Sequence, residues 1–225
     1  MTYLPDAEAF IRANLPLVEV PGTGLRLHLA GPRSGLSRLV PPGGTPYWAH
    51  AWPGGVALAL HLAAQPETVQ GRSVWEIGAG SGLVSLAALR AGAEAATAVD
   101  TDPLAAVATR VNAEANGLPA PRVLIRAAGE LSLDWASAGA SRGRSAVLAG
   151  DVFYDAASAR HATEALDGAA AALGPDAPIL VGDIGRRFLP RDRLEPLACY
   201  PVRDVGDPPS APLREGWVFR WTPLP

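Results

Sequence analysis

The chain has 225 residues, of which 48% are hydrophobic, and its formal net charge is −3. This size and apolar content fit one folded domain with an appendage and exclude a disordered chain, while the weak acidic charge offers no basic surface for nucleic acid or an anionic membrane. A single cysteine, Cys199, excludes an internal disulfide framework and a cysteine-based zinc site, and we expect no metal.

The first part of the chain, residues 1–45, is predicted to form the appendage, and residues 46–225 the main domain. Residues 6–15 have the pattern of a short helix. Two runs of alternating hydrophobicity, 18–20 and 25–29, flank a turn rich in proline and glycine, which predicts a β-hairpin. The main domain begins with an aromatic segment from Pro46 to Gly55, which either packs the appendage onto the main domain or walls a flat ligand.

From residue 71 onward, strands and helices are predicted to alternate. Strands are expected at 73–77, 95–99, 122–126, 145–150, 178–182, 199–205 and 215–221, and helices at 83–89, 104–116, 156–173 and 189–197. The last two strands are joined by a loop too short for a crossover helix, so they should be antiparallel. The expected fold is α/β, a doubly wound, mostly parallel seven-stranded sheet of Rossmann-like type, in which ligands bind beyond the carboxyl ends of the strands.

A glycine-rich loop joins the first of these strands to its helix, in the order Glu76-Ile77-Gly78-Ala79-Gly80-Ser81-Gly82. The spacing Gly-x-Gly-x-Gly differs from the dinucleotide fingerprint, which requires Gly-x-Gly-x-x-Gly. A carboxylate at Glu76 disfavours a pyrophosphate and favours a ligand that carries positive charge. Glycines permit the unusual backbone angles of such a turn and leave bare backbone against a ligand.

Two further positions are candidates for contacts with a nucleoside. Asp100 ends the next strand, where a carboxylate can accept hydrogen bonds from a ribose diol. The alternative role, a helix cap, suits Asp102 better, because Asp102 directly precedes Pro103. Trp135, after the third strand and next to Asp134, either packs on an adenine ring or belongs to the core.

The segment Asp151-Val152-Phe153-Tyr154-Asp155 leaves the fourth strand, where a second substrate would lie beside the first. Asp155 directly precedes a predicted helix and serves as its cap, which leaves Asp151 available for function. An acid followed three positions later by an aromatic residue resembles the acceptor motif of enzymes that methylate amino groups.

These motifs, in this order, resemble the electron transfer flavoprotein β-subunit lysine methyltransferases, which belong to the class I, or seven-β-strand, methyltransferases. The aromatic segment ending in Trp52-Pro53-Gly54-Gly55 and the segment from Asp151 to Tyr154 carry most of the resemblance. The stretch from Gly182 to Arg186 adds to it, although Ile184 stands where the family pattern suggests proline.

The resemblance implies that the cofactor is S-adenosyl-L-methionine and assigns roles to individual residues. Glu76, Gly78, Gly80 and Gly82 would line the amino-acid end of the cofactor. Trp52 would wall its pocket, Asp100 would hold the ribose, and Trp135 would lie near the adenine. Asp151 and Tyr154 would be the catalytic residues, with Asp151 first of all a group that positions the acceptor amine and only secondarily a base.

The function implied is methyl transfer from S-adenosyl-L-methionine to lysine ε-amines of a protein partner, the electron transfer flavoprotein β subunit. Two alternatives stay open: an N-methyltransferase for a small amine or a nicotinamide-like nitrogen, and a non-catalytic S-adenosylmethionine-binding module. No apolar run approaches the length of a membrane span, and residues 1–10 lack the pattern of a signal peptide. We therefore expect a cytoplasmic protein with neither a membrane nor a nucleic-acid partner.

Overall fold

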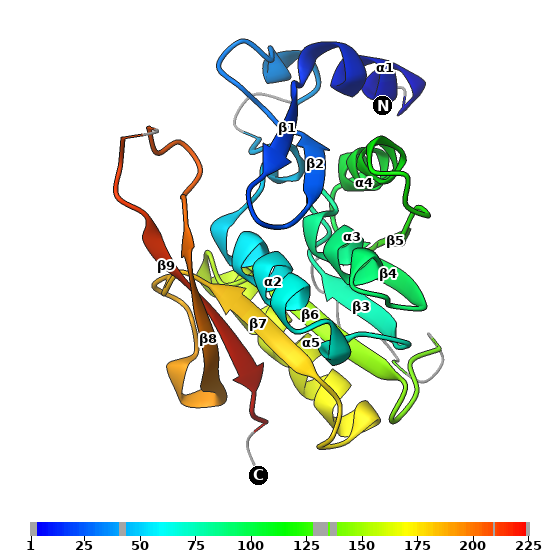
Figure 1. Ribbon diagram of the computed structural model, residues 1–225, viewed down its shortest axis with the longest axis vertical. Helices are drawn as coiled ribbons and strands as arrows, with labels where there is room; N and C mark the ends of the chain where they lie inside the picture. Colours follow the sequence, from blue (N-terminus) through cyan, green and yellow to red (C-terminus); the bar gives the residue numbers. More distant parts are fainter. Residues whose placement is uncertain (1–3, 41–43, 128–134, 136–138, 209, 224–225) are drawn as a thin grey trace.

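The computed structural model describes residues 4–40, 44–127, 135, 139–208 and 210–223. Its centre is a seven-stranded sheet with the strand order β5-β4-β3-β6-β7-β9-β8 (Figure 1). The strands are β3 (Ser73–Ile77), β4 (Ala95–Asp100), β5 (Arg122–Ile125), β6 (Ser145–Gly150), β7 (Ile179–Asp183), β8 (Leu194–Val202) and β9 (Arg214–Trp221). Strands β3 to β7 are parallel, and β9 runs antiparallel to both β7 and β8. The predicted fold class and the closing antiparallel pair are therefore confirmed.

Strand β3 is the point at which the order of the sheet reverses. It pairs with β4 on one side and with β6 on the other. Strands β4 and β5 therefore extend the sheet to one side of β3, and the later strands extend it to the other. In open α/β sheets the crevice at such a switch point, beyond the carboxyl ends of the strands, is where ligands bind.

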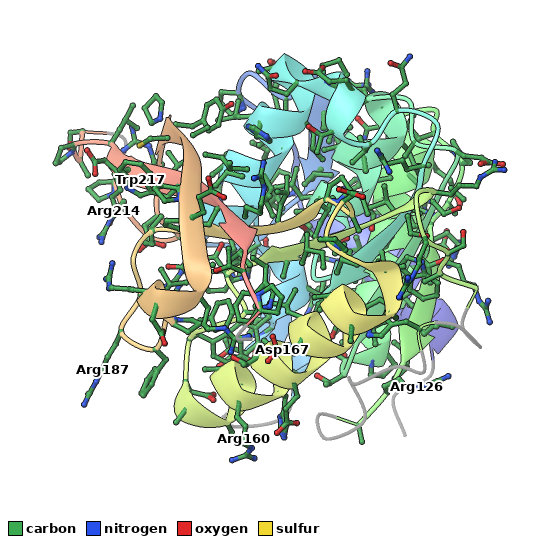
Figure 2. All side chains as sticks on the ribbon, turned by 90° about the horizontal axis from the view of Figure 1, so that it is seen from below. Arg126, Arg160, Asp167, Arg187, Arg214 and Trp217 are labelled. Atoms are coloured by element: carbon green, nitrogen blue, oxygen red, sulfur yellow. The ribbon has the colours of Figure 1, made fainter. Side chains whose placement is uncertain are left out.

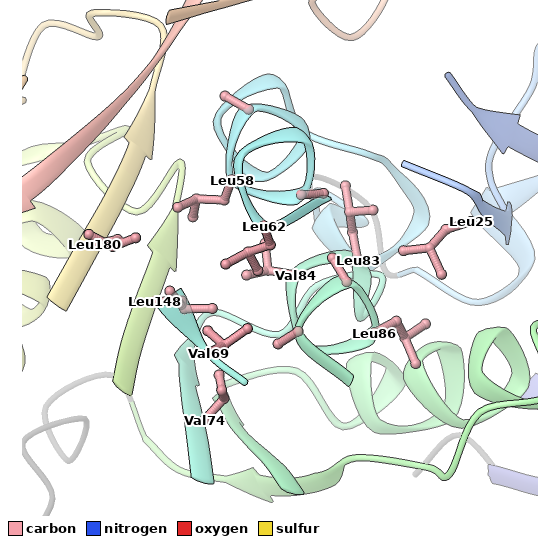
Figure 3. Close-up of a cluster of buried hydrophobic side chains, with 14 of the residues drawn as sticks. Leu25, Leu58, Leu62, Val69, Val74, Leu83, Val84, Leu86, Leu148 and Leu180 are labelled. Atoms are coloured by element: carbon pink, nitrogen blue, oxygen red, sulfur yellow. The ribbon is translucent and has the colours of Figure 1, made fainter. Parts of the chain in front are cut away.

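Helices cover both faces of this sheet (Figure 1). One face carries α2 (Pro53–Ala64), α3 (Leu83–Arg90) and α4 (Pro103–Ala115), and the other carries α5 (Ala156–Leu173). Alternate residues of each strand supply the two cores, since successive side chains of a strand point to opposite faces. Under α2 and α3, the apolar cluster includes Leu58, Leu62, Val74, Val84, Leu148 and Leu180 (Figure 3). Under α5, it includes Trp75, Val147, Leu166, Val181 and Trp221.

The N-terminal segment packs on the α4 side of the sheet. Helix α1 (Leu4–Asn14) contacts α4, and the predicted hairpin is present as β1 (Leu17–Val20) and β2 (Leu25–His28). Two asparagines of α4 hold the hairpin: Asn112 Oδ1 accepts from His28 N at 2.7 Å, and Asn116 Oδ1 accepts from Arg26 N at 2.9 Å. Short 3-10 turns lie at Leu36–Arg38, Tyr47–Ala49, Pro66–Thr68 and Arg191–Arg193.

One predicted helix, 189–197, is wrong. The structure has a 3-10 turn at Arg191–Arg193 followed directly by strand β8. Pro196 would break a helix, because it lacks an N–H group and its ring clashes with the preceding turn. An edge strand tolerates proline, and β8 is an edge of the sheet. Within the parts of the chain that the structure describes, no helix is long and apolar enough to cross a membrane.

Candidate functional site

A cavity of about 570 Å³ opens at the carboxyl edge of the sheet, beside the switch point. Its volume lies in the range of small-molecule sites, which is roughly 300–1,000 Å³. It brings together six of the predicted site residues, which are Trp52, Gly78, Gly80, Asp100, Asp151 and Tyr154. The other three, Glu76, Gly82 and Trp135, are not among the residues that line it.

The glycine loop and Asp100 form one end of this cavity. Gly78 and Gly80 have φ angles of +80° and +49°, which L-residues with side chains rarely adopt. Asp100 fixes the loop through its carboxylate: Oδ2 accepts from Gly80 N at 2.9 Å, and Oδ1 accepts from Asp102 N at 2.9 Å. Burial raises the pKa of Asp100, and the backbone N–H groups of Asp102 and Gly80 oppose that rise. The carboxylate thus orders the loop and still lines the cavity.

Glu76 lies beneath the loop, away from the cavity. The residue is 2% exposed, and its Oε2 accepts from Ser85 N at 3.0 Å and from the Ser85 hydroxyl. These contacts satisfy a free N–H in the first turn of α3. Burial raises the pKa of Glu76 to about 8, so the carboxyl is largely neutral at pH 7. Its role is to connect β3 to α3. The Glu76 carboxyl, which we expected to favour a positively charged ligand, does not line the cavity.

Gly82 also acts through packing. A β-carbon there would lie 2.8 Å from Thr109 Oγ1 on α4, and the φ angle of +82° disfavours a side chain as well. The third glycine therefore lets the start of α3 approach α4 closely.

Trp135 lies in the core. It is 3% exposed and meets Trp75 edge to face, with ring centroids 5.7 Å apart. Gly168 on α5 leaves room for the indole, since a β-carbon at that position would lie 3.3 Å from Trp135 Nε1. Of the two interpretations of Trp135, the structure shows the core residue. Its neighbour Asp134 lies outside the described residues.

Asp151 forms the opposite end of the cavity. Its φ angle of +54° is the one positive φ among the non-glycine residues described, and such backbone strain is typical of functional sites. Oδ2 accepts from Gly54 N and, at 3.1 Å, from Gly55 N, at the start of α2. Oδ1 accepts from Arg186 Nε at 3.0 Å. Burial raises the pKa of Asp151 to about 6, and the guanidinium of Arg186 opposes this rise.

Three aromatic side chains form a wall of the cavity beside Asp151. The rings of Tyr47 and Tyr154 are 5.1 Å apart, and those of Tyr47 and Trp52 are 5.6 Å apart. Trp52 Nε1 donates to the Tyr47 carbonyl oxygen at 2.9 Å, which fixes the indole. As predicted, Asp155 caps α5 by accepting from Ser158 N at 2.7 Å, and it also lies among the residues that line the cavity.

Tyr47 and Arg186 are among the lining residues that were not predicted as site residues. Tyr47 belongs to the aromatic segment from Pro46 to Gly55. One of the two interpretations of that segment was a wall for a flat ligand. Arg186 is preceded by a Gly-Asp pair at the end of β7, but no spacing rule links it to Asp151, which lies 35 residues earlier.

The charged groups that line the cavity are mostly acidic. They are Asp100, Asp102, Asp151 and Asp155, with Arg186 as the cation and His161 as a further titratable group. This lining favours a positively charged ligand. Among the described residues, no group of three or more His, Cys, Asp or Glu side chains is arranged to hold a metal ion.

Comparisons with known proteins identify relatives of this chain. Residues 57–137 match the family model described as ribosomal protein L11 methyltransferase (PrmA). The chain is 39% identical over 185 residues to the electron transfer flavoprotein beta subunit lysine methyltransferase of Danio rerio, covering 80% of this chain and 67% of that protein. It is 33% identical over 211 residues to the protein of the same name from Xenopus laevis, covering 88% and 80%.

Solved structures share the fold at low sequence identity. TrmN from Thermus thermophilus matches with a TM-score of 0.51 and 20% identity, covering 75% of this chain and 50% of that one. Precorrin-6y C5,15-methyltransferase from Geobacter metallireducens matches with a TM-score of 0.51 and 16% identity, covering 73% and 87%. At these identities the likeness extends to the fold alone.

Proposed function

Because this chain belongs to the family of the electron transfer flavoprotein β-subunit lysine methyltransferases, we propose that it methylates lysine ε-amines of a protein, with the electron transfer flavoprotein β subunit as the first candidate substrate. Membership of this family makes the chain an S-adenosylmethionine-dependent methyltransferase. The observation that carries the proposal is that the glycine loop with Asp100 and the pair Asp151 and Tyr154 line one cavity.

The residues at the loop end of the cavity fit the cofactor. Gly78 and Gly80 offer bare backbone, and the Asp100 carboxylate suits the hydroxyls of a ribose. Trp52 offers a flat apolar wall, and the acidic lining suits a group that carries both an ammonium and a sulfonium. When bound, S-adenosylmethionine supplies a methyl group on positively charged sulfur, which an amine can attack directly. Glu76 and Gly82 support the loop from behind, and Trp135 supports the sheet.

The residues at the other end of the cavity would receive the acceptor amine. A lysine amine has an ordinary pKa of about 10.4, and it must lose its proton before it can attack. Transfer from water into a partly buried cavity lowers that pKa. Tyr154 and Tyr47 flank the path to Asp151 and would hold the aliphatic stem of the lysine, which aligns the nitrogen.

Exposed aromatic surface at the mouth of the cavity supports a protein acceptor over a small molecule. Tyr47 and Tyr154 are 42% and 45% exposed, although both line the cavity. A small amine that entered the cavity would leave much of this surface in water, whereas a protein segment that presents a lysine would cover it. Aromatic side chains are enriched at such interfaces.

The test is a methyl-transfer assay with the purified protein, isotopically labelled S-adenosylmethionine and the electron transfer flavoprotein β subunit. Parallel reactions contain nicotinamide or no acceptor. The chain has no lysine, so a methyl group found on a lysine must lie on the partner. We expect label on lysines of the β subunit, located by mass spectrometry, and none on nicotinamide. Label on nicotinamide alone would identify a small-molecule enzyme, and cofactor binding without transfer to any acceptor would identify a non-catalytic module.

A further inference from the structure

Arg186 is the one arginine among the residues that line the cavity, and the proposed function gives it no task. It lies in the loop after β7, and its side chain is 22% exposed. Its Nε donates to Asp151 Oδ1 at 3.0 Å, and its Nη2 also lies 3.0 Å from the same oxygen, without the alignment of a hydrogen bond. A guanidinium and a carboxylate in this arrangement form a charge-assisted contact, which is stronger than a hydrogen bond between neutral groups.

The contacts of Asp151 leave little room for another donor. A carboxylate offers about four acceptor positions on its two oxygens. Oδ2 uses its positions for Gly54 N and Gly55 N, and Oδ1 faces both Nε and Nη2 of Arg186. The Asp151 side chain is 5% exposed. An entering amine would therefore have to displace Arg186 before it could transfer a proton to Asp151.

Arg186 also contacts Trp52 of the cavity wall and Asp204 outside it. Its guanidinium carbon lies 5.7 Å from the centre of the Trp52 ring, and Nη2 lies 3.8 Å from Asp204 in the β8–β9 connection. The other charged groups nearby are Asp183, which faces both Asp151 and Arg186, and Arg191, which faces Asp183. One side chain thus joins the end of β6, the segment before α2 and the β8–β9 connection.

We propose that Arg186 is a positioning residue for methyl transfer: it holds the Asp151 carboxylate ionised and occupied, so that Asp151 anchors the walls of the acceptor end and does not take the proton of the amine. The proton of the acceptor nitrogen then leaves to water. The guanidinium also offsets the negative charge of the Asp151 carboxylate, which would otherwise favour the ammonium form of the acceptor over the neutral, nucleophilic amine. This inference rests on the proposed function for its activity readout alone.

The test compares Arg186→Met and Arg186→Lys with the matched control Arg214→Gln. Arg214 also contacts Asp204, at 3.7 Å, but its side chain is 51% exposed, it is not among the residues that line the cavity, and it lies at the edge of the molecule in Figure 2. Two quantities are measured from pH 5.5 to 9: the dissociation constant of S-adenosylhomocysteine by calorimetry, and kcat for methyl transfer. Thermal unfolding at each pH identifies the range in which every variant is folded.

In Arg186→Met, we expect the acid limb of both profiles to move up by about one pH unit or more, because loss of a nearby cation raises the pKa of a carboxyl. The profile for S-adenosylhomocysteine should move as well, because the Asp151 carboxylate holds Gly54 N and Gly55 N just after Trp52, and its protonation loosens that wall of the cavity. We also expect kcat at pH 9, where Asp151 is ionised in every variant, to fall about 10- to 100-fold, since small misplacements of reacting groups cost this much. Arg186→Lys keeps the positive charge, so its acid limb should stay close to that of the unsubstituted protein while kcat still falls. Arg214→Gln should match the unsubstituted protein in both profiles.

Two results would overturn the proposal. If Asp151 is a base, Arg186→Met frees a stronger base, and kcat at pH 9 stays the same or rises. If Arg186 does not control the ionisation of Asp151, the acid limb of the S-adenosylhomocysteine profile does not move in Arg186→Met. This second readout needs no methyl acceptor, so it decides the role of Arg186 even where the unsubstituted protein methylates none of the acceptors tried. Where Arg186→Met does not fold, an acid limb displaced by a full pH unit in Arg186→Lys would contradict the electrostatic role instead.

Discussion

Gly54 and Gly182 lie so close together that neither position has space for a β-carbon. A β-carbon on Gly182 would lie 2.1 Å from Gly54 O, and one on Gly54 would lie 2.2 Å from Gly182 O. Both obstacles are backbone atoms, which cannot rotate away. This contact brings the start of α2 against the end of β7 and allows the Gly54 N–H to reach Asp151.

Gly182→Ala is therefore expected to push α2 away from the sheet. Overpacking of this kind costs about 1–3 kcal/mol, and each 1 kcal/mol lowers the melting temperature of a domain of this size by about 2–4 °C. The matched control is Gly31→Ala, where the nearest atom to a new β-carbon is Pro16 Cγ at 3.9 Å. Thermal unfolding measures both variants. Equal melting temperatures for the two would contradict the steric argument.

The buried carboxyl of Glu76 should make stability depend on pH. The fold raises its pKa from 4.5 to about 8, so the folded state favours the protonated form. The stability that this group contributes is fully present below pH 4.5 and is lost as the pH rises through 8. Glu76→Gln mimics the protonated carboxyl, so it should unfold like the unsubstituted protein at pH 5 and be at least as stable at pH 9.

The measurement for Glu76 is the midpoint of denaturant unfolding at pH 5, 7 and 9. Glu94→Gln is the control, because Glu94 is exposed and, among the described residues, its ion contact is with Arg144 at 3.4 Å. In the Glu94 variant, the midpoint should change with pH as it does in the unsubstituted protein. If the midpoint of Glu76→Gln also changed with pH as in the unsubstituted protein, the Glu76 carboxyl would not titrate as its burial implies.

The fold could be predicted from the sequence because its signals are local. Apolar runs, glycines after helices and the caps Asp102 and Asp155 lie within a few residues of the elements that they define. The prediction was wrong for residues 189–197, which include a 3-10 turn and the first part of strand β8. Pairing with β9 determines the structure there, and this pairing is between residues distant in the sequence.

The site was predictable only in its outline, for a related reason. The pattern placed Asp100 and Asp151 at the ends of strands, and both line the cavity. It could not show that Asp151 meets Gly54 N, 97 residues away, or Arg186, 35 residues away. Glu76 and Trp135 show the converse: residue types that suit a ligand lie in the interior, where Ser85 and Trp75 are their partners.

Asp100→Asn should weaken binding at the loop end of the cavity. The amide can keep one acceptor oxygen, but it replaces the other with a donor that faces Gly80 N or Asp102 N. Hydrogen bonds to a charged group are worth about 1.5–3 kcal/mol, which corresponds to a roughly 10- to 100-fold loss of affinity for S-adenosylhomocysteine. The control is Asp176→Asn, because Asp176 is exposed and is not among the residues that line the cavity. Calorimetry that gives the same dissociation constant for both variants would exclude Asp100 from the site.

Asn112 should transmit changes in the N-terminal hairpin to the glycine loop. It is fully buried, and it accepts from His28 N at 2.7 Å while Nδ2 donates to Ser81 O at 2.9 Å. Asn112→Ala leaves these two backbone groups unpaired, which costs about 1–3 kcal/mol for each buried group. The loop then loses a support, so we expect lower affinity for S-adenosylhomocysteine together with lower stability.

The control for Asn112 is Asn116→Ala. Asn116 bonds to Arg26 N and Arg26 O of the same hairpin and donates to the Asn112 carbonyl oxygen, and among the described residues none of its hydrogen bonds reaches the glycine loop. We expect this variant to exchange the amide hydrogens of the hairpin faster, yet to bind S-adenosylhomocysteine as the unsubstituted protein does. Both variants should loosen the hairpin. Only Asn112→Ala should also lower the affinity for S-adenosylhomocysteine, because only this variant releases Ser81. If both variants bind equally well, the hairpin and the loop are independent.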